Sequence, residues 1–378
     1  MAVSATVVVA GAGLAGLAAA WELSRAGADV VLLDAERRPG GMVVTERPGG
    51  PGGPGGPGGK DGFVVEGGPD GFLAAEPDIQ ELARDAGVGG RLVDQLASGS
   101  SLWTGQRLEP LAEGQAAALL GIQIPEDAGA QHAAPLQFGF RSFATGMLDL
   151  VEALVARLAP VFRPAQGVTG LAPATRGWRL SLNGGSTVEA EAVILALPAW
   201  AAARLVTGAG VPAARHLDDV IYYPSTTVSL AYRSDQLAAA PAGTGFVSAA
   251  EWGESGAAVR ACSYSWLKYP GRAPPGHALI RAFVGPVDGD PAAAAHAELA
   301  GILGIRGSAL WSRAFTWPRG LPRYKPGHAG HVAAVRERLA RLAPLAIAGA
   351  GFDGAGVSAC VKSGREAARE ILHRLGQV

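Results

Sequence analysis

The residues with the clearest chemical potential are three glycines near the start of the chain, Gly11, Gly13 and Gly16, at G-x-G-x-x-G spacing. This spacing provides a tight turn, a close approach of the backbone to a pyrophosphate, and close packing of the following helix. Asp34 follows about twenty residues later, where an acidic side chain can accept hydrogen bonds from ribose hydroxyls. The pattern predicts a dinucleotide site. It leaves open whether the dinucleotide is a nicotinamide or a flavin.

The elements that must position these residues are a strand, a helix and a second strand. Residues 6–10 are apolar and rich in β-branched side chains, which predicts a buried parallel strand. Residues 14–25 are rich in Ala and Leu and predict a helix, and residues 30–33 predict the second strand. The N-terminus of the helix would present free N–H groups and a partial positive charge to the phosphates.

Composition indicates a soluble globular protein of 378 residues, long enough for two domains, with 48% hydrophobic and 17% charged residues. A net charge of −1 gives no reason to expect nucleic acid or an anionic membrane as a partner. Two cysteines, Cys262 and Cys360, indicate neither a disulfide framework nor a metal site. We find no apolar run long enough to span a bilayer and no signal peptide, so a cytoplasmic location is expected.

The order of predicted elements suggests a domain that the chain leaves and later re-enters. Segments of α/β character lie at both ends, and a more antiparallel part lies between them. The Gly- and Pro-rich residues 47–60 predict a surface loop. Helices are predicted at residues 76–86, 142–158 and 358–375, and strands at 63–66, 178–182, 192–197, 222–232, 278–284 and 346–350.

A second glycine-rich turn near the C-terminus identifies the dinucleotide. It contains Gly349, Gly351, Gly354 and Gly356 and is followed by Val357 and a predicted helix. Reduced flavin carries negative charge near N1, which the N-terminus of that helix would stabilise, whereas a nicotinamide enzyme has no need of this second turn. The sequence therefore predicts a resident FAD. The alternative is that these glycines only cap the helix.

Together with the segment from Asp34 to Thr45, these two turns resemble the flavin amine oxidase and protoporphyrinogen oxidase superfamily. The resemblance implies an α/β fold: a Rossmann-like FAD-binding domain of the glutathione-reductase/amine-oxidase type with an inserted α+β substrate domain on a mixed sheet. The expected boundaries are 1–75, 142–204 and 340–378 for the FAD-binding domain, and 76–141 and 205–339 for the substrate domain. The cofactor-binding residues predicted from the spacing and the resemblance are Gly11, Gly13, Leu14, Ala15, Gly16, Asp34, Ala35, Arg37, Arg38, Gly40, Gly41, Gly67, Gly68, Pro69, Val168, Trp317, Gly349, Gly351, Gly354, Gly356 and Val357.

Two further segments resemble the protoporphyrinogen and coproporphyrinogen oxidases of this superfamily. "VEGGPDGFL" (65–73) is similar to their Glu-x-Gly-Pro-x-x-Phe signature, and "FTWPRGLPRYKPGH" (315–328) is similar to their Trp-Pro-x-Gly-x-Pro-x-Tyr-x-x-Gly-His segment. Alternatively, the second segment is a rigid proline-rich turn packed on the core. His328 is then a structural residue, and Glu66 only bonds the backbone.

The chain departs from the family in its middle. Family members are longer, and the shortfall falls near residues 107–137, where the family has much of its helical substrate- and membrane-binding region. An arginine that pairs with a substrate propionate in the family aligns near Ser100, and Arg107 could substitute for it. Membrane association and a porphyrinogen substrate are therefore in doubt. Residues 221–233 lack the lysine that amine oxidases place near flavin N5, which argues against amine oxidation.

The resemblance implies FAD-dependent oxidation of protoporphyrinogen IX or coproporphyrinogen III to the porphyrin, with oxygen as electron acceptor, in haem biosynthesis. The alternatives are another FAD-dependent small-molecule oxidase or desaturase, or a shortened flavin-binding paralogue without activity. The partners expected are a tetrapyrrole or other apolar ring compound and oxygen, and the oligomeric state is left open. No catalytic residue is assigned. The candidate substrate-binding residues are Phe72, Trp103, Arg107, Phe138, Arg141 and Trp317, with Phe140 as a further candidate.

Overall fold

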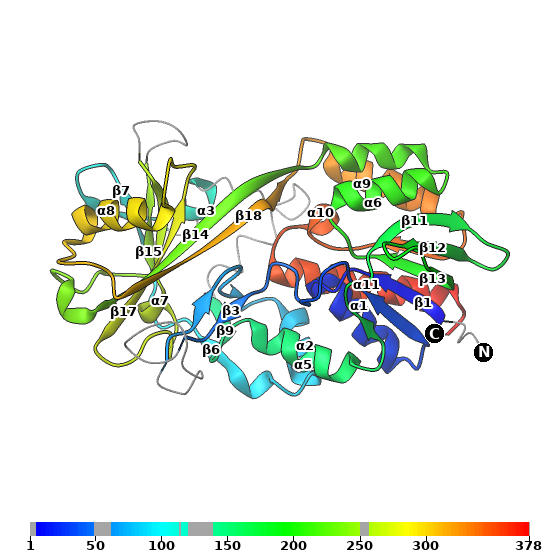
Figure 1. The fold of residues 1–378 in the computed structure, drawn as a ribbon, viewed down its shortest axis with the longest axis horizontal. Helices are drawn as coiled ribbons and strands as arrows, with labels where there is room; N and C mark the ends of the chain where they lie inside the picture. The colour runs from blue at the N-terminus through cyan, green and yellow to red at the C-terminus, as the bar shows by residue number, and fades with distance from the viewer. Residues whose placement is uncertain (1–4, 49–61, 113–114, 120–138, 250–256, 378) are drawn as a thin grey trace.

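The computed structural model describes residues 5–48, 62–112, 115–119, 139–249 and 257–377. Two large sheets organise this part of the chain, and they lie at opposite ends of the molecule (Figure 1). A long pair of strands, β14 (Ile221–Arg233) and β18 (Trp311–Arg323), reaches from one end toward the other. In the described residues, no helix is both long and apolar enough to cross a membrane.

The first sheet contains the predicted dinucleotide-binding elements. Its central strands β1 (Ala5–Ala10), β2 (Val30–Leu33), β13 (Thr187–Leu195) and β19 (Leu345–Ile347) run parallel, and β10 (Phe162–Arg163) pairs with β2 at one edge. Two antiparallel strands, β11 (Val168–Pro173) and β12 (Trp178–Leu182), extend the sheet beyond β13. Strands from both ends of the chain therefore meet beside β13, since β1 and β19 both pair with it.

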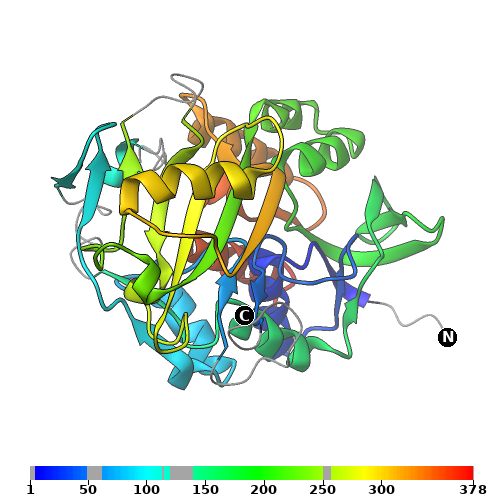
Figure 2. The same cartoon turned by 60° about the vertical axis from the view of Figure 1, so that its left-hand side comes forward.

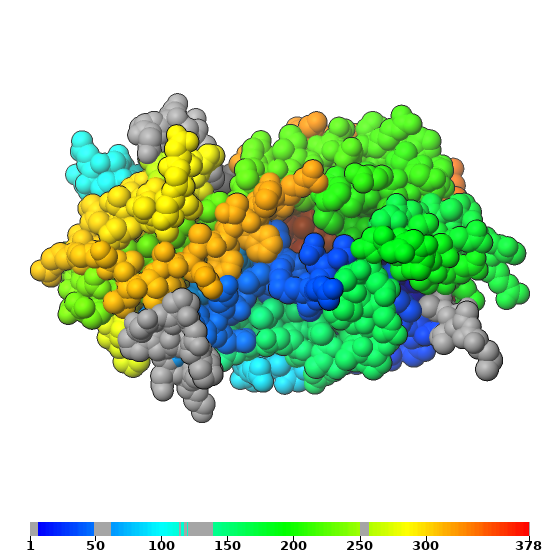
Figure 3. Space-filling view, viewed as in Figure 1, coloured from blue at the N-terminus to red at the C-terminus, as the bar shows by residue number. Residues whose placement is uncertain are grey.

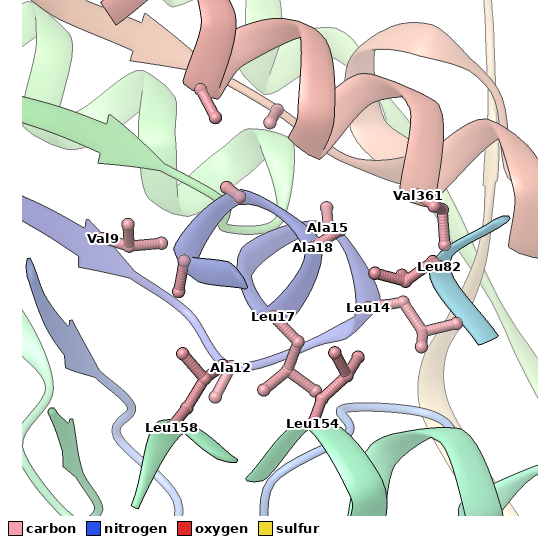
Figure 4. Close-up of a cluster of buried hydrophobic side chains, with 14 of the residues drawn as sticks. Val9, Ala12, Leu14, Ala15, Leu17, Ala18, Leu82, Leu154, Leu158 and Val361 are labelled. Atoms are coloured by element: carbon pink, nitrogen blue, oxygen red, sulfur yellow. The ribbon is translucent and has the colours of Figure 1, made fainter. Parts of the chain in front are cut away.

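Helices cover both faces of this sheet because its central strands are apolar on both sides. One face packs against α1 (Leu14–Arg25), α2 (Pro77–Asp85), α5 (Leu148–Leu158) and α11 (Val357–Arg374). Figure 4 shows this core, where Leu14, Leu17 and Ala18 of α1 lie between Leu154 of α5 and Val361 of α11. The other face packs against α6 (Ala199–Gly208), the 3-10 helix η4 (Pro212–Asp219) and α9 (His328–Leu339).

The second sheet is almost entirely antiparallel, in the order β18-β14-β17-β16-β15-β7-β8. Its remaining strands are β17 (His277–Val284), β16 (Val259–Tyr264), β15 (Gly245–Ser248), β7 (Ser100–Trp103) and β8 (Leu108–Leu111), and only the β15–β7 pair is parallel. Helix α8 (Pro291–Leu303) lies across one face of this sheet (Figure 2). Side chains alternate between the two faces, so the odd-numbered residues of β17, such as Arg281 and Phe283, point away from α8.

Short elements connect the two large sheets. Strands β3 (Thr45–Glu46) and β4 (Val65–Glu66) pair with each other, and β9 (Phe140–Phe143) pairs with β5 (Phe72–Leu73) and β6 (Leu92–Asp94). The remaining short elements are η1 (Gly89–Arg91), α3 (Gln115–Leu119), η5 (Ser234–Gln236), α7 (Ser265–Lys268) and α10 (Ala350–Asp353).

The predicted fold class is confirmed, and the residue boundaries of its two domains remain a prediction. Three local expectations are wrong. Residues 140–143 form strand β9 and the helix begins only at Leu148, because Phe140–Phe143 pairs with two other short strands. Residues 315–323 continue β18 and form no turn; their two prolines are tolerated because β18 is an edge strand with an irregular register opposite Tyr223. The last strand ends at Ile347, since Ala350 begins α10. Most of the predicted loop at 47–60 lies outside the described residues.

Candidate functional site

The first wall of the candidate cofactor site is the turn between β1 and α1. A Cβ at Gly16 would lie 1.7 Å from the carbonyl oxygen of Gly11, so only glycine allows α1 to pack this closely on the turn. Gly13 is the N-cap of α1, and within the described residues no side chain caps this helix end. Leu14 and Ala15 form the buried first turn. The free N–H groups of that turn are therefore available to an anion such as a pyrophosphate.

Asp34 lies beside this turn at the end of β2. Its carboxylate accepts hydrogen bonds from the backbone N–H groups of Ala12, at 2.5 Å, and Glu36, at 2.7 Å. Arg38 donates to the carbonyl oxygens of Val43, at 2.9 Å, and Gly41. These contacts fix the segment from Asp34 to Gly41 along the glycine turn, where Gly40 N donates to Ala12 O at 2.7 Å.

Two further predicted cofactor-binding residues, Ala35 and Val168, lie next to this segment. A Cβ on Gly167 would lie 2.9 Å from the Cβ of Ala35, so the start of β11, including Val168, runs alongside residue 35. Arg37 is exposed. The structure thus brings Ala35 and Val168 close together, although they are far apart in the sequence.

The second wall is the backbone of Gly67 and Gly68, which the second large sheet holds in place. Trp317 of β18 donates its indole N–H to Gly67 O at 2.8 Å, and Arg281 of β17 donates to Gly68 O at 2.6 Å. The other side of the segment lies against the backbone of Met42, where a Cβ on Gly68 would come within 1.8 Å of its carbonyl oxygen. Two strands of the second large sheet therefore set the position of one wall of the candidate cofactor site. Pro69 follows directly and is half-buried.

A cluster of buried polar side chains around Glu66, the residue directly before the second wall in the chain, fixes the position of this wall. Glu66 is 4% exposed and accepts hydrogen bonds from the Thr45 hydroxyl, at 2.6 Å, and from Met147 N, at 2.8 Å. Burial raises the pKa of Glu66, although the positive charge of Arg272 opposes this shift. Arg272 is itself fully buried and donates to Ser142 Oγ at 2.6 Å. Glu66 thus has side-chain as well as backbone partners, and the cluster joins β3, β4 and the start of α5.

A second ion pair lies just beyond Gly68. Asp70 accepts a hydrogen bond from Lys268 Nζ at 2.9 Å. Burial favours the protonated acid, but the charges of Lys268 and Arg281 outweigh it and lower the pKa of Asp70 to about 2. Asp70 is therefore a permanent anion at neutral pH, and it ties the loop after Gly68 to α7.

The third wall is the turn between β19 and α11. Gly349 N donates to Ser363 Oγ at 2.8 Å, and Tyr324 donates its hydroxyl to Ala350 O at 2.5 Å. Gly351 packs against Tyr222, whose hydroxyl oxygen would lie 2.8 Å from a Cβ at that position. Gly354 and Gly356 lead into Val357, the first residue of α11. In the described chain no side chain caps α11, so this helix end also offers free N–H groups.

His328, at the start of α9, stacks on Tyr324 with a centroid distance of 4.6 Å. Burial lowers the pKa of His328, so the imidazole is neutral at pH 7. Burial raises the pKa of Tyr222 and of Tyr324, so both phenols stay protonated. Uncharged aromatic side chains therefore surround the third wall.

A cavity of about 360 Å³ opens between the segment after β2 and the end of β18, lined by Asp34, Glu36, Arg38, Gly41 and Trp317. Figure 3 shows the hollow between the blue N-terminal segment and the orange β18, with residues from the red C-terminal part at its floor. Two uncapped helix N-termini, a carboxylate at the end of β2 and a groove between them fit an extended dinucleotide with a flat ring at the C-terminal turn.

The other candidate substrate residues are not gathered at this groove. Phe72 is 3% exposed and packs in the core beside Phe143, with a centroid distance of 6.1 Å. Trp103 packs in the cluster beneath α8, because it lies on the opposite face of its sheet from Arg281. Phe140 is half-buried beneath Lys268, and Phe138 lies outside the described residues.

Both candidate arginines already have acidic partners within the chain. Arg107 is exposed and pairs with Glu109 at 2.7 Å. Arg141 donates to Asp94 and Gln80, at 2.6 and 2.7 Å. Of the substrate candidates that the structure describes, only Trp317 lines the cofactor cavity.

Sequence reasoning missed the side chains that fix the three walls by hydrogen bonds and ion pairs but are not among the predicted site residues. Arg281 had a signal, since it is a charge within the apolar stretch "ALIRAFV". No signal in the sequence marked Ser363, Arg336 or Lys268, because each of them bonds a residue on a distant element.

Comparison with known proteins agrees with this geometry. Residues 90–372 match the family described as flavin containing amine oxidoreductase, and residues 9–86 match an NAD(P)-binding Rossmann-like domain. The chain is 23% identical to a coproporphyrinogen III oxidase of Bacillus subtilis over 97% of both chains. It is 30% identical to a coproporphyrinogen III oxidase of Mycobacterium tuberculosis, over 80% of this chain and 68% of that one.

Solved structures share the fold over the whole chain. A provisionally named protoporphyrinogen oxidase from Exiguobacterium superposes with a TM-score of 0.77 at 24% identity, covering 100% of each chain. Cyclohexylamine oxidase from Brevibacterium oxydans gives a TM-score of 0.75 at 15% identity, covering 99% of this chain and 100% of that one.

The chain thus belongs to the flavin-containing amine oxidoreductase family, whose model matches most of its length. It is an FAD-dependent oxidoreductase.

Proposed function

We propose that this flavoenzyme oxidises a porphyrinogen, coproporphyrinogen III or protoporphyrinogen IX, to the porphyrin, with oxygen as the final electron acceptor. The observation that carries the proposal is the position of the Trp-Pro…Gly-His segment, the most specific part of the resemblance. This segment forms the end of β18 and contacts two walls of the groove: Trp317 bonds Gly67 O, and Tyr324 bonds Ala350 O. Relatives named coproporphyrinogen III oxidase align along almost the whole chain and support the same substrate class.

FAD, when bound, supplies a two-electron acceptor for hydride and is reoxidised by oxygen. The residues of this chain bind and orient it: α1 and α11 direct free N–H groups toward negative charge, and Asp34 offers a carboxylate for hydroxyl groups. Trp317 and Arg281 fix the backbone of Gly67 and Gly68 on the opposite wall. Binding that fixes the position and orientation of the reacting groups makes a bimolecular reaction step effectively unimolecular.

No strong acid or base is required of the protein for hydride removal, and the aromatic side chains around the third wall carry no charge. His328 is neutral at pH 7, and Tyr222 and Tyr324 remain protonated, in each case because of burial. A porphyrinogen becomes aromatic through three such two-electron oxidations. Each round consumes one oxygen molecule and forms one hydrogen peroxide, so electrons and protons balance.

The test is an aerobic assay with FAD-loaded protein and either porphyrinogen, followed by porphyrin fluorescence. Porphyrin should form well above the rates of a no-enzyme reaction and a heat-denatured control, with peroxide formed in step. Bound FAD without acceleration for either substrate would reject the proposal and leave the family assignment intact. Another small-molecule oxidation or a non-catalytic role would then need testing.

A further inference from the structure

The turn that precedes α11 contains one acidic residue, Asp353, and within the described residues its carboxylate does not cap the helix. Asp353 is the acidic residue closest in sequence to the N-terminus of α11, whose N-cap is Gly356. Gly356 has no side chain to bond the free N–H groups there, and a negative charge close to a helix N-terminus is stabilising. Both carboxylate oxygens of Asp353 instead have other partners.

Arg336 of α9 makes a two-point contact with this carboxylate. Its guanidinium donates to Oδ1 at 2.8 Å and to Oδ2 at 2.7 Å, which is the planar geometry that makes arginine–carboxylate pairs strong. Oδ2 also accepts a hydrogen bond from Ser363 at 2.5 Å, and Ser363 accepts one from Gly349 N at 2.8 Å. The contacts form a connected chain from α9 through Asp353 to the beginning of the turn.

The N-terminus of α11 therefore keeps groups that are free to form hydrogen bonds. Its N-terminus has no side-chain cap within the described residues. Ser358, in the first turn of the helix, is 3% exposed, and in the same part of the chain its hydroxyl oxygen has no hydrogen-bond partner. A buried helix end with unused donors is suited to an anionic partner.

We propose that Arg336 is a positioning residue for the cofactor: it holds Asp353 away from the N-terminus of α11 and so keeps that helix end for the negative charge of reduced FAD. Arg336 acts through Asp353 and touches neither cofactor nor substrate. The inference rests on the proposed placement of the flavin ring at the third wall, and it stands or falls independently of the porphyrinogen substrate.

The test is the midpoint potential of bound FAD, measured by equilibrium reduction against a reference dye. Arg336→Gln removes two hydrogen bonds to Asp353 and the charge that balances it, so the preference of the protein for reduced over oxidised FAD should fall about 2- to 5-fold, the size of one helix-terminus charge interaction. Adding Asp353→Asn to Arg336→Gln should restore the potential. Arg338→Gln is the matched control, because Arg338 lies on the same helix and its side chain donates, among the described residues, only to Ala334 O of that helix.

An unchanged potential in Arg336→Gln, or a double variant that stays as low as the single one, would overturn the proposal. If Arg336→Gln fails to fold, Asp353→Asn alone decides. The asparagine can still accept from Ser363 but carries no charge, so its potential should equal or exceed that of the unsubstituted protein. A lower potential in that variant would contradict the inference. Loss of porphyrinogen turnover with normal potentials would concern the proposed function alone.

Discussion

The contact between Trp317 and Gly67 offers the sharpest test of how the second large sheet contributes to the candidate cofactor site. The indole N–H of Trp317 donates to Gly67 O at 2.8 Å, and its ring lines the cavity beside Asp34 and Arg38. Trp317→Phe removes the donor and keeps an aromatic ring. A hydrogen bond between neutral groups contributes about 0.5–1.5 kcal/mol. If that loss is expressed in cofactor binding, the dissociation constant for FAD should rise about 2- to 12-fold.

The assay is a titration of FAD into protein freed of its cofactor, followed by the change in flavin fluorescence. Trp178→Phe is the matched control, since Trp178 also donates its indole N–H to a backbone oxygen, that of Pro344, at 3.2 Å. Trp178 packs in the core on the α6 and α9 side of the first sheet, so its substitution should lower thermal stability and leave FAD affinity unchanged. The reasoning is refuted if Trp317→Phe binds FAD as tightly as the unsubstituted protein, or if both variants lose affinity equally.

Three further outcomes are expected. Gly364→Ala places a Cβ 2.0 Å from Ala15 O, so α11 must shift away from α1. The free energy of unfolding measured in thermal melts should therefore fall by about 1–3 kcal/mol. Gly330→Ala is the control, because its Cβ would meet nothing within 4 Å and should not destabilise the protein. The pKa of Asp70 is about 2 when folded, below its ordinary 3.8, so its pair with Lys268 stabilises the protein above about pH 4. That contribution, about 2 kcal/mol, should be lost as pH falls from 4 toward 2, and Asp70→Asn should abolish this part of the acid sensitivity. Removal of FAD should lower the melting temperature of the protein, because a ligand present at 100 times its dissociation constant stabilises the folded state by about 2.7 kcal/mol. A melting temperature that does not change on removal of FAD would contradict specific binding.

The local elements of the cofactor site could be predicted because their signals are local. Helix α1 runs from Leu14 to Arg25 and strand β2 from Val30 to Leu33, the ranges that the apolar pattern and the glycine spacing indicate. Helix α11 begins at Val357, one residue before the predicted start, since Gly356 is its N-cap. Here the residues that form each element lie next to one another in the chain.

Features that depend on distant partners could not be predicted. The helical pattern predicted from residue 142 includes Ser142 and Phe143, yet pairing of Phe140–Phe143 with β5 and β6 makes these residues part of a strand. The prolines of β18 indicate a turn, but position at the sheet edge allows a strand. The contacts of Arg281 with Gly68 and of Arg336 with Asp353 depend on how separate elements pack, and no spacing rule reports that.

The substrate candidates show the same limit. Aromatic and arginine residues at Phe72, Trp103 and Arg107 suit a flat carboxylated substrate by type alone. The structure places the first in one core, the second in another, and the third in an exposed pair with Glu109. Residue type indicated the chemistry, whereas only the packing showed which side chain, Trp317, reaches the groove.

The most direct test of the central claim is a single turnover without oxygen. FAD-loaded protein is mixed anaerobically with coproporphyrinogen III, and the absorbance of oxidised flavin is followed, with benzylamine in a parallel reaction. The account predicts rapid loss of the oxidised-flavin band with the porphyrinogen, no loss with the amine, and recovery of the band when air is admitted. Flavin that stays oxidised with coproporphyrinogen III and with protoporphyrinogen IX, or that the amine reduces instead, would contradict the proposed function.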